Sequence, residues 1–271
     1  MITRLVVRIL LFVTVATTLA PAQLFRTTSK VGTTAAQFLK IGVGARAVAM
    51  GSAQVAVRND VSALYWNPAA ISRINAASEL TFNHVNWLAD ISFDYAGAIM
   101  DLGSAGTLGF SVTSLSVPED IVRTVEFPDG DGRRWDASAL AVGVAYARNL
   151  TDRFSIGLHA KYVREAVWSE SASAFALDIG TLYVSELPGL TLGASITNFG
   201  TRMRLEGRDL MFNTDPDGNI GSGPNNVPAQ YRTSDYELPL LFRVGVAYDA
   251  WRSDDVRVTA AVDAAHPNDN M

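Results

Sequence analysis

The chain has 271 residues, of which 48% are apolar and 18% are charged, with no cysteine and a formal net charge of −5. This acidic balance argues against nucleic acid as a partner, because neutralising phosphate groups needs a concentrated basic face. The lack of cysteine excludes disulfides, thiolate catalysis and cysteine-ligated metal, and a chain of this length is sufficient for one large β-domain.

The N-terminal residues predict export from the cytoplasm. Arg4 and Arg8 precede an apolar run at 9–20, and Ala20-Pro21-Ala22 places small residues at the two cleavage positions. We therefore expect residues 1–22 to be a cleaved signal peptide. The alternative, a membrane-spanning helix, needs about 20 apolar residues, and this run is shorter.

Residues 23–75 contain the two most specific clusters of the chain. The first consists of small residues between Gly42 and Gly51, where glycine allows close backbone approach or a positive φ. In the second, Pro68 fixes its own φ and pushes Asn67 out of the helical region, so the chain turns there. We expect a compact segment that ends in a fixed turn.

A longer set of residues in this segment matches a known family. The set is Ala35-Ala36-Gln37-Phe38-Leu39, Gly44-Ala45-Arg46-Ala47, Ala49-Met50-Gly51, Asp60, Ala63 and Trp66-Asn67-Pro68-Ala69. With these residues the segment resembles the N-terminus of the PorV/PorQ family of outer-membrane proteins, which are relatives of FadL-type barrels. The match extends over about forty positions and is more specific than any single short motif.

The resemblance implies an all-β fold, an antiparallel transmembrane β-barrel of FadL-like type. Residues 23–75 would form a hatch inside the lumen, and residues 76–271 would form barrel strands. The residues expected to have a structural role in the hatch are Gly42, Gly44, Arg46, Gly51, Asp60, Trp66, Asn67 and Pro68.

From Ala76 onward, large apolar residues alternate with small or polar ones, which is typical of β-strands. This pattern predicts nine strands, at 78–88, 91–101, 106–116, 135–148, 153–164, 173–185, 190–199, 239–250 and 255–264. Most of them are long for a globular protein and suit a tilted crossing of a bilayer. The small side chains on the opposite face leave room inside a barrel for the hatch.

The connections between these strands are expected to alternate in length. Short turns are predicted at 103–105, 149–152, 186–189 and 252–254, and longer connections at 117–134, 165–172 and 200–238. The two sets fall on opposite ends of the strands, as the short periplasmic turns and long outer loops of outer-membrane barrels do. The connection at 89–90 is a short exception on the outer end.

Aromatic residues lie near the predicted strand ends, where interface girdles would place them. They are Trp87, Trp135, Tyr146, Trp168, Tyr183, Tyr248 and Trp251. Soluble barrels and sandwiches also end strands with aromatic residues. The even strand number of bacterial barrels, set against nine predicted strands, leads us to expect missing C-terminal strands after 266–271, with about fourteen in all on a FadL plan.

Other motifs give little indication of chemistry. The stretch 42–47 fits the dinucleotide pattern G-x-G-x-x-A, but it follows a polar leader and precedes antiparallel strands, so we interpret it as a hatch turn. His84, His159 and His266 lack zinc-ligand spacing, and His159 is expected to be a hydrogen-bonded wall residue. No G-x-S-x-G motif occurs. We expect no catalysis, no cofactor and no metal site.

Two acidic stretches, 129–132 and 215–219, resemble the start of a calcium loop but lack its later ligands, so we interpret them as turns in outer loops. The charged hatch residues Arg46, Arg58 and Asp60 would each need a partner inside a barrel. The candidates on the small-residue face are Asp178, Arg243, Arg257 and Asp263. Such a pair would form either a displaceable latch or a fixed anchor.

By its resemblance, the protein is expected to assist secretion and surface attachment of the type IX kind. It would lie in outer-membrane lipid and bind secretion-system or cargo proteins through residues 117–134 and 200–238. One alternative is a FadL-like channel for a hydrophobic small molecule, with Phe38 or Leu39 lining the pocket. Another is a soluble periplasmic β-barrel that binds a ligand or acts as a scaffold.

Overall fold

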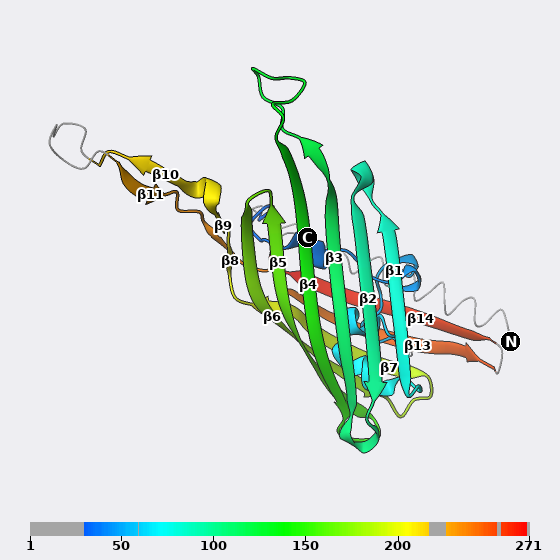
Figure 1. Ribbon diagram of the computed structural model, residues 1–271. Coiled ribbons are helices and arrows are strands. Elements are labelled where there is room, and N and C mark those ends of the chain that lie inside the picture. Colours follow the sequence, from blue (N-terminus) through cyan, green and yellow to red (C-terminus); the bar gives the residue numbers. More distant parts are fainter. Residues whose placement is uncertain (1–29, 59, 217–225, 254–255, 270–271) are drawn as a thin grey trace. The chain divides into compact units, whose positions relative to one another are not determined.

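The computed structural model describes residues 30–58, 60–216, 226–253 and 256–269 (Figure 1). The chain divides into two units, and the larger one, which begins at Gly32, contains all the elements described below. The expected signal peptide and the first part of the expected hatch, residues 23–29, lie outside the described residues.

One antiparallel sheet dominates this unit. Its strands follow one another along the chain in the order β1-β2-β3-β4-β5-β6-β7-β13-β14, and β1 and β14 lie at the two ends of that order. They are β1 (Ser78–Asn86), β2 (Ser92–Asp101), β3 (Thr107–Ile121), β4 (Arg134–Asn149), β5 (Phe154–Val167), β6 (Glu170–Val184), β7 (Leu190–Gly200), β13 (Leu241–Arg252) and β14 (Arg257–Pro267). Each expected strand overlaps one of these, so the all-β antiparallel prediction is confirmed.

The connections at one end of the sheet are short, as expected. They comprise the 3-10 helix η4 (Gly103–Ala105) and the turns 150–153, 185–189 and 253–256. The opposite end carries η3 (Leu88–Asp90) and the connections 122–133, 168–169 and 201–240. The long loop expected at 165–172 was wrong, because β5 and β6 extend toward each other and leave a two-residue turn in which Trp168 has a φ of 56°.

The connection 201–240, which we call the arm, contains regular structure that the sequence analysis treated as a loop. Its elements are β8 (Met203–Arg204), β9 (Glu206–Gly207), η5 (Arg208–Leu210), β10 (Met211–Thr214), β11 (Val227–Gln230) and β12 (Asp235–Tyr236). β10 pairs with β11, β12 pairs with β8, and β9 adds to β6 of the main sheet. Figure 1 shows the β10–β11 hairpin in yellow and orange, extending beyond the main strands.

Residues 34–74, which we call the N-terminal segment, pack against one face of the main sheet. Their helices are η1 (Gln37–Lys40), α2 (Ala45–Ala49), α3 (Ala63–Trp66) and η2 (Pro68–Arg73). We call the strands of the main sheet the wall. Leu64 and Ile71 form a buried cluster with wall residues that include Leu182 of β6. A second cluster joins Phe38 and Leu39 to Val163, Met203 and alanines of the wall. The core therefore lies between this segment and the sheet.

The two faces of the sheet differ in the opposite sense to those of a soluble protein. In β4 the alanines at 139, 141, 145 and 147 are buried against the N-terminal segment. The large residues between them, Leu140, Val142, Val144 and Tyr146, are 38–51% exposed. The same exposure of large apolar residues recurs on β1, β3, β6, β7, β13 and β14. Within the described ranges no helix is both long and apolar enough to cross a membrane.

Candidate functional site

Glycines of the wall strands make room for the N-terminal segment. A Cβ added to Gly180 of β6 would collide with the side chain of Asn67, and one added to Gly157 of β5 would collide with the backbone of Pro68 and Ala69. Gly193 and Gly245 receive Val55 in the same way, and Gly109 receives Leu64. The face of small residues that the sequence predicted therefore leaves room for the N-terminal segment to pack closely against the strands.

Asn67 lies at the centre of this contact and is fully buried. Its Oδ1 accepts from the backbone N–H of Ala69 at 3.1 Å and caps η2, in which Pro68 takes the first position. Its Nδ2 donates to the carbonyls of Val55 at 2.7 Å and Thr181 at 3.0 Å. One side chain therefore ties together the turn, the middle of the segment and the wall.

Trp66 is buried beside Asn67 and is fixed by two contacts. Its Nε1 donates to the carbonyl of Val43 at 2.9 Å, and the guanidinium of Arg243 from β13 lies 5.0 Å from its ring centroid. Gly42 leaves room for the indole, since an added Cβ would lie 3.3 Å from it. The Trp66 carbonyl accepts from Ser195 Oγ at 3.0 Å.

The remaining expected glycines act through the backbone. Gly44 precedes α2 with a φ of 87°, and Gly51 has a φ of 68° with no atom near an added Cβ. A side chain would strain the left-handed conformation at both positions. Gly42 and Gly44 follow no strand of the described structure, so the dinucleotide-like pattern lacks the βαβ context that nucleotide binding needs.

The charged residues of the segment find their partners differently from the expectation. Arg46 pairs with Asp60 at 2.9 Å, so this ion pair lies within the segment and uses no wall residue. Asp60 also accepts from the backbone N–H of Ser62 at 2.8 Å. Burial lowers the pKa of Arg58, and the nearby charge of Arg257 acts in the same direction.

Of the four expected wall partners, Asp263 and Arg243 contact the N-terminal segment. Asp263 Oδ2 accepts from the backbone N–H of Val55 at 2.9 Å. Arg257 instead pairs with Asp249 at 2.9 Å. These contacts depend on strand register, which sequence spacing alone does not give.

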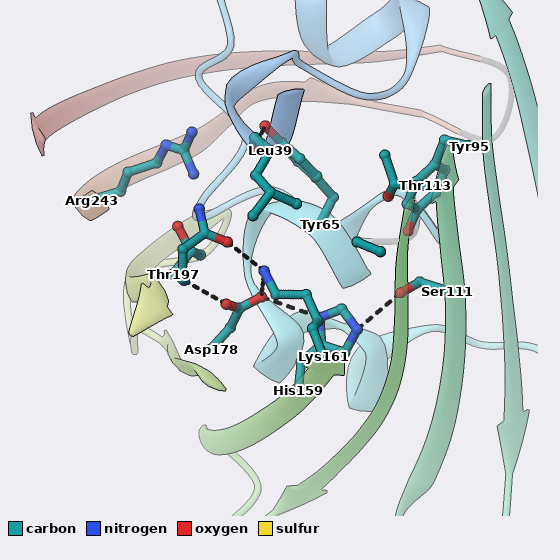
Figure 2. A pocket seen from close by; sticks show the side chains of 12 residues that line it. Leu39, Tyr65, Tyr95, Ser111, Thr113, His159, Lys161, Asp178, Thr197 and Arg243 are labelled. Carbon is teal, nitrogen blue, oxygen red and sulfur yellow. Dashed lines mark hydrogen bonds and ion pairs between the residues drawn. The ribbon is translucent and has the colours of Figure 1, made fainter. Parts of the chain in front are cut away.

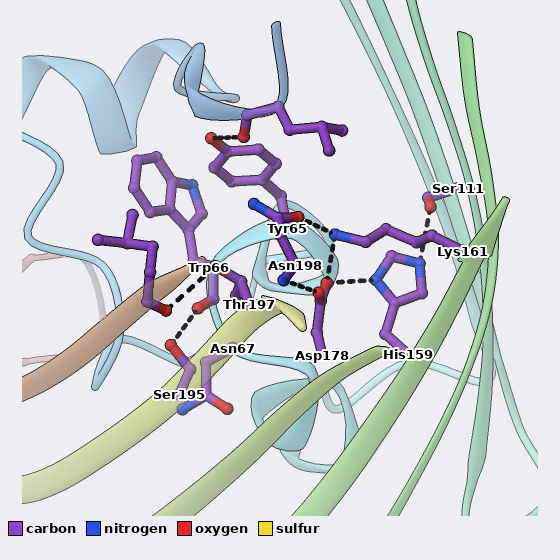
Figure 3. Close-up of polar contacts among 12 residues, drawn as sticks. Tyr65, Trp66, Asn67, Ser111, His159, Lys161, Asp178, Ser195, Thr197 and Asn198 are labelled. Carbon is purple, nitrogen blue, oxygen red and sulfur yellow. Dashed lines mark hydrogen bonds and ion pairs between the residues drawn. The ribbon is translucent and has the colours of Figure 1, made fainter. Parts of the chain in front are cut away.

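A buried polar cluster lies on the wall beneath Tyr65 (Figure 3). Asp178 of β6 accepts from Lys161 Nζ at 2.8 Å, from His159 Nδ1 at 3.2 Å and from the Asn198 backbone N–H at 2.7 Å. His159 Nε2 lies 2.9 Å from Ser111 Oγ. Asn198 has a φ of 63°, opposite a register shift in β6. The expectation of a hydrogen-bonded wall histidine is confirmed.

Ser111, His159 and Asp178 follow the order of a nucleophile, base and orienting acid. The cavity beside them measures about 20 Å³, and Leu39 and Tyr65 of the N-terminal segment are among its lining residues. This is room for about one water molecule. Asp178 is also neutralised by Lys161, so the cluster in this structure is suited to holding the wall together. Sequence reasoning missed the cluster because its members lie on separate strands without a motif.

Tyr65 covers this cluster from the side of the N-terminal segment. Its hydroxyl donates to the carbonyl of Leu39 at 2.9 Å. Burial raises the pKa of Tyr65 to about 12, although the charge and hydrogen bond of Arg243 act in the opposite direction. Among the described residues, no group of three or more histidine or acidic side chains is arranged to hold a metal ion.

Residues 25–265 match the family model of the type IX secretion system protein PorV. The chain belongs to the PorV family. The match extends from the expected hatch through β13 and most of β14, so the family resemblance seen at residues 35–69 is confirmed and extended across the sheet. A search of curated proteins found no match.

In this member of the PorV family, the start of the N-terminal segment is tied to the base of the arm. Asp269 accepts from Lys40 Nζ at 2.7 Å and from Thr34 Oγ1 and Gln37 Nε2 at 3.2 Å each. The Ala35 backbone N–H donates to the carbonyl of Glu237 at 2.9 Å. This junction joins the segment, the arm and the residues that follow β14.

The opposite end of the segment is tied to the short turns. Arg73 Nε donates to Ser155 Oγ at 2.7 Å, and its terminal nitrogens donate to the carbonyls of Asp152 and Thr151. Ser72 and Asn149 exchange two hydrogen bonds nearby, at 2.8 and 3.0 Å. The segment is therefore fastened at both ends and in its centre.

Proposed function

We propose that this protein is an outer-membrane β-barrel protein that assists type IX secretion by binding partner or cargo proteins without catalysis. The observation that carries the membrane location is the inverted sheet. Its outer face exposes large apolar side chains, and its inner face buries alanine, glycine and polar residues against the N-terminal segment. Soluble monomers rarely expose so continuous an apolar surface, whereas lipid would cover it.

The outer face is apolar on strand after strand. Leu80 and Phe82 of β1 are 75% and 67% exposed, and Phe175 of β6 is 67% exposed. Six of the seven aromatic residues expected in interface girdles are exposed, namely Trp87, Tyr146, Trp168, Tyr183, Tyr248 and Trp251. A soluble periplasmic scaffold would leave this surface in water at a large free-energy cost.

The N-terminal segment supports the hatch part of the proposal. It lies on the small-residue side of the main sheet, where glycines of the strands make room for it at five positions. In a complete barrel this side would be the lumen. The cavity beneath it measures only about 20 Å³, which is too small for a hydrophobic molecule with a chain, so it does not favour a channel of that kind.

The partner-binding surface in this proposal comprises the arm and the β3–β4 connection. Phe212 of β10 and Tyr231, which directly follows β11, stack with centroids 4.5 Å apart, and Tyr231 is largely exposed. Val125 and Phe127 are exposed on the β3–β4 connection. Exposed aromatic residues on protruding elements are common anchors of protein interfaces.

The test separates membrane assembly from partner binding. We expect the full-length protein in the outer-membrane fraction, with gel mobility that changes on heating. Deleting residues 200–238 should keep that mobility change and abolish co-purification of secretion-system proteins. A second variant, in which a short Gly-Asn turn replaces 123–132, should also keep the mobility change and weaken co-purification, because it removes the exposed Val125 and Phe127. Recovery of wild-type protein in an osmotic-shock extract would refute the membrane location, and unchanged co-purification after the arm deletion would refute the role of the arm.

A further inference from the structure

The cavity beneath Tyr65 is lined by more positive than negative side chains (Figure 2). Two cations, Lys161 and Arg243, line it together with one carboxylate, Asp178. Lys161 is paired with Asp178 at 2.8 Å, and the same carboxylate also accepts from His159 and Asn198. The charge of Asp178 is therefore already engaged within the cluster.

Arg243 is a buried cation that lines this cavity. The residue is only 8% exposed, and among the described residues no carboxylate lies within 4.0 Å of its guanidinium nitrogens. Its guanidinium carbon lies 5.0 Å from the ring centroid of Trp66, and its charge also acts on the phenol of Tyr65. Asp263 interacts with Arg243 electrostatically without forming an ion pair, and Oδ2 of Asp263 accepts a hydrogen bond from the Val55 N–H. A guanidinium carries five donors, and burying it without an anionic partner is costly.

A second donor faces the same cavity without a partner. Tyr95 of β2 lines the cavity and is 1% exposed, and within the described part of the chain its hydroxyl makes no hydrogen bond. Buried polar groups are almost always hydrogen-bonded, and this hydroxyl is able to donate to a ligand in the cavity. The Arg243 cation and the Tyr95 hydroxyl are both hydrogen-bond donors, so both favour a ligand that accepts hydrogen bonds.

We propose that the cavity binds a small inorganic anion of the chloride class beside Arg243. Its volume of about 20 Å³ restricts the occupant to roughly the size of a water molecule and excludes a carboxylic acid with a chain. The anion would balance the guanidinium at the place where Trp66 and Tyr65 of the N-terminal segment meet the wall. It would thereby strengthen the seating of that segment, and the inference does not depend on partner binding.

The direct experiment uses a heavier halide. Crystals of the full-length protein in detergent, grown with bromide in place of chloride, should give an anomalous peak in this cavity next to Arg243. The peak should be absent in Arg243→Gln and kept in Arg202→Gln, a matched control whose arginine pairs with Glu237 on the surface. Density without anomalous signal would show water and overturn the proposal, as would bromide found only at surface positions.

A solution measurement covers the case in which Arg243→Gln does not fold. The midpoint of thermal unfolding of the wild-type protein should rise and saturate as potassium chloride replaces potassium gluconate at constant ionic strength. Arg243→Lys, which keeps the positive charge, should retain part of this dependence. A midpoint that is the same in both salts would contradict anion binding.

Discussion

The side chain of Asn67 donates to the carbonyl of Thr181 across 3.0 Å and so joins the N-terminal segment to β6. β6 is a regular strand at this point, and the N-terminal segment turns at the neighbouring Pro68. One side-chain amide therefore connects the turn to the strand. Asn67→Ala should remove the hydrogen bonds that the side chain donates to the carbonyls of Val55 and Thr181 and should also remove the cap of η2. We expect a loss of about 2–4 kcal/mol in the free energy of unfolding.

Urea titration in detergent measures this loss, and Asn213→Ala, at an exposed position of β10, is the control. Asn67→Asp keeps the cap acceptor but loses both donors, so it should not restore stability. A wild-type unfolding midpoint in Asn67→Ala would contradict the anchoring role.

Gly180→Ala should unseat the turn, because the added methyl group would occupy the place of the Asn67 amide. Overpacking of this kind typically costs about 1–3 kcal/mol. We expect faster protease cleavage within residues 34–74, with the wall strands still protected. Thr181→Ala is the neighbouring control, since it keeps the backbone carbonyl that Asn67 uses. Equal cleavage rates in Gly180→Ala and Thr181→Ala would contradict the conclusion that Gly180 makes room for Asn67.

Removing one member of the buried Asp178–Lys161 pair should be worse than removing both charges. Asp178→Asn leaves Lys161 buried without a counter-charge, for which we expect a cost of about 3–5 kcal/mol. The double variant Asp178→Asn with Lys161→Met should recover part of that loss. A double-mutant cycle on unfolding free energies gives the coupling directly, and strict additivity would show that the pair does not interact.

The start of the N-terminal segment should respond to Asp269 more than to Lys40. Asp269 accepts from three side chains of the segment, whereas Lys40 is one donor and is about a third exposed. Asp269→Asn should therefore speed hydrogen exchange at residues 34–40 strongly, and Lys40→Met only slightly. Exchange in β5 serves as the internal reference. The reverse order of effects would show that Lys40 is the principal tie.

Tyr65 should make stability fall at alkaline pH. Burial raises its pKa to about 12 in the folded protein, above its ordinary value of 10.0. The unfolded chain therefore loses this proton first, and the contribution of Tyr65 to stability declines as the pH rises from 10 toward 12. Tyr65→Phe should flatten that decline, which unfolding midpoints measured across this pH range would show. Parallel profiles for the two proteins would exclude Tyr65 as the cause.

Much of the sheet followed from the sequence because its alternation is regular. The alternation around Leu140 and Val142 predicted both the position of the strand and the face on which each side chain lies, because residues two apart in a strand lie on the same face. The turn at Asn67-Pro68 was equally local, because Pro68 restricts its own backbone and that of its neighbour. These features depend on residues adjacent in the chain.

The contacts that sequence reasoning missed depend on register between distant strands. Ser111, His159 and Asp178 meet because β3 to β6 pair in one alignment, which no spacing along the chain specifies. Arg46 was expected to reach the wall, yet Asp60 is nearer once α2 and α3 fold together. The short strands of the arm were missed because two to four residues are too few to show a period.

Glu237 has two roles at the base of the arm. Its backbone carbonyl holds the N–H of Ala35, and its carboxylate holds Arg202, 2.9 Å away at the other root of the same arm. A force that pulls the arm outward would therefore also act on the start of the N-terminal segment through Glu237.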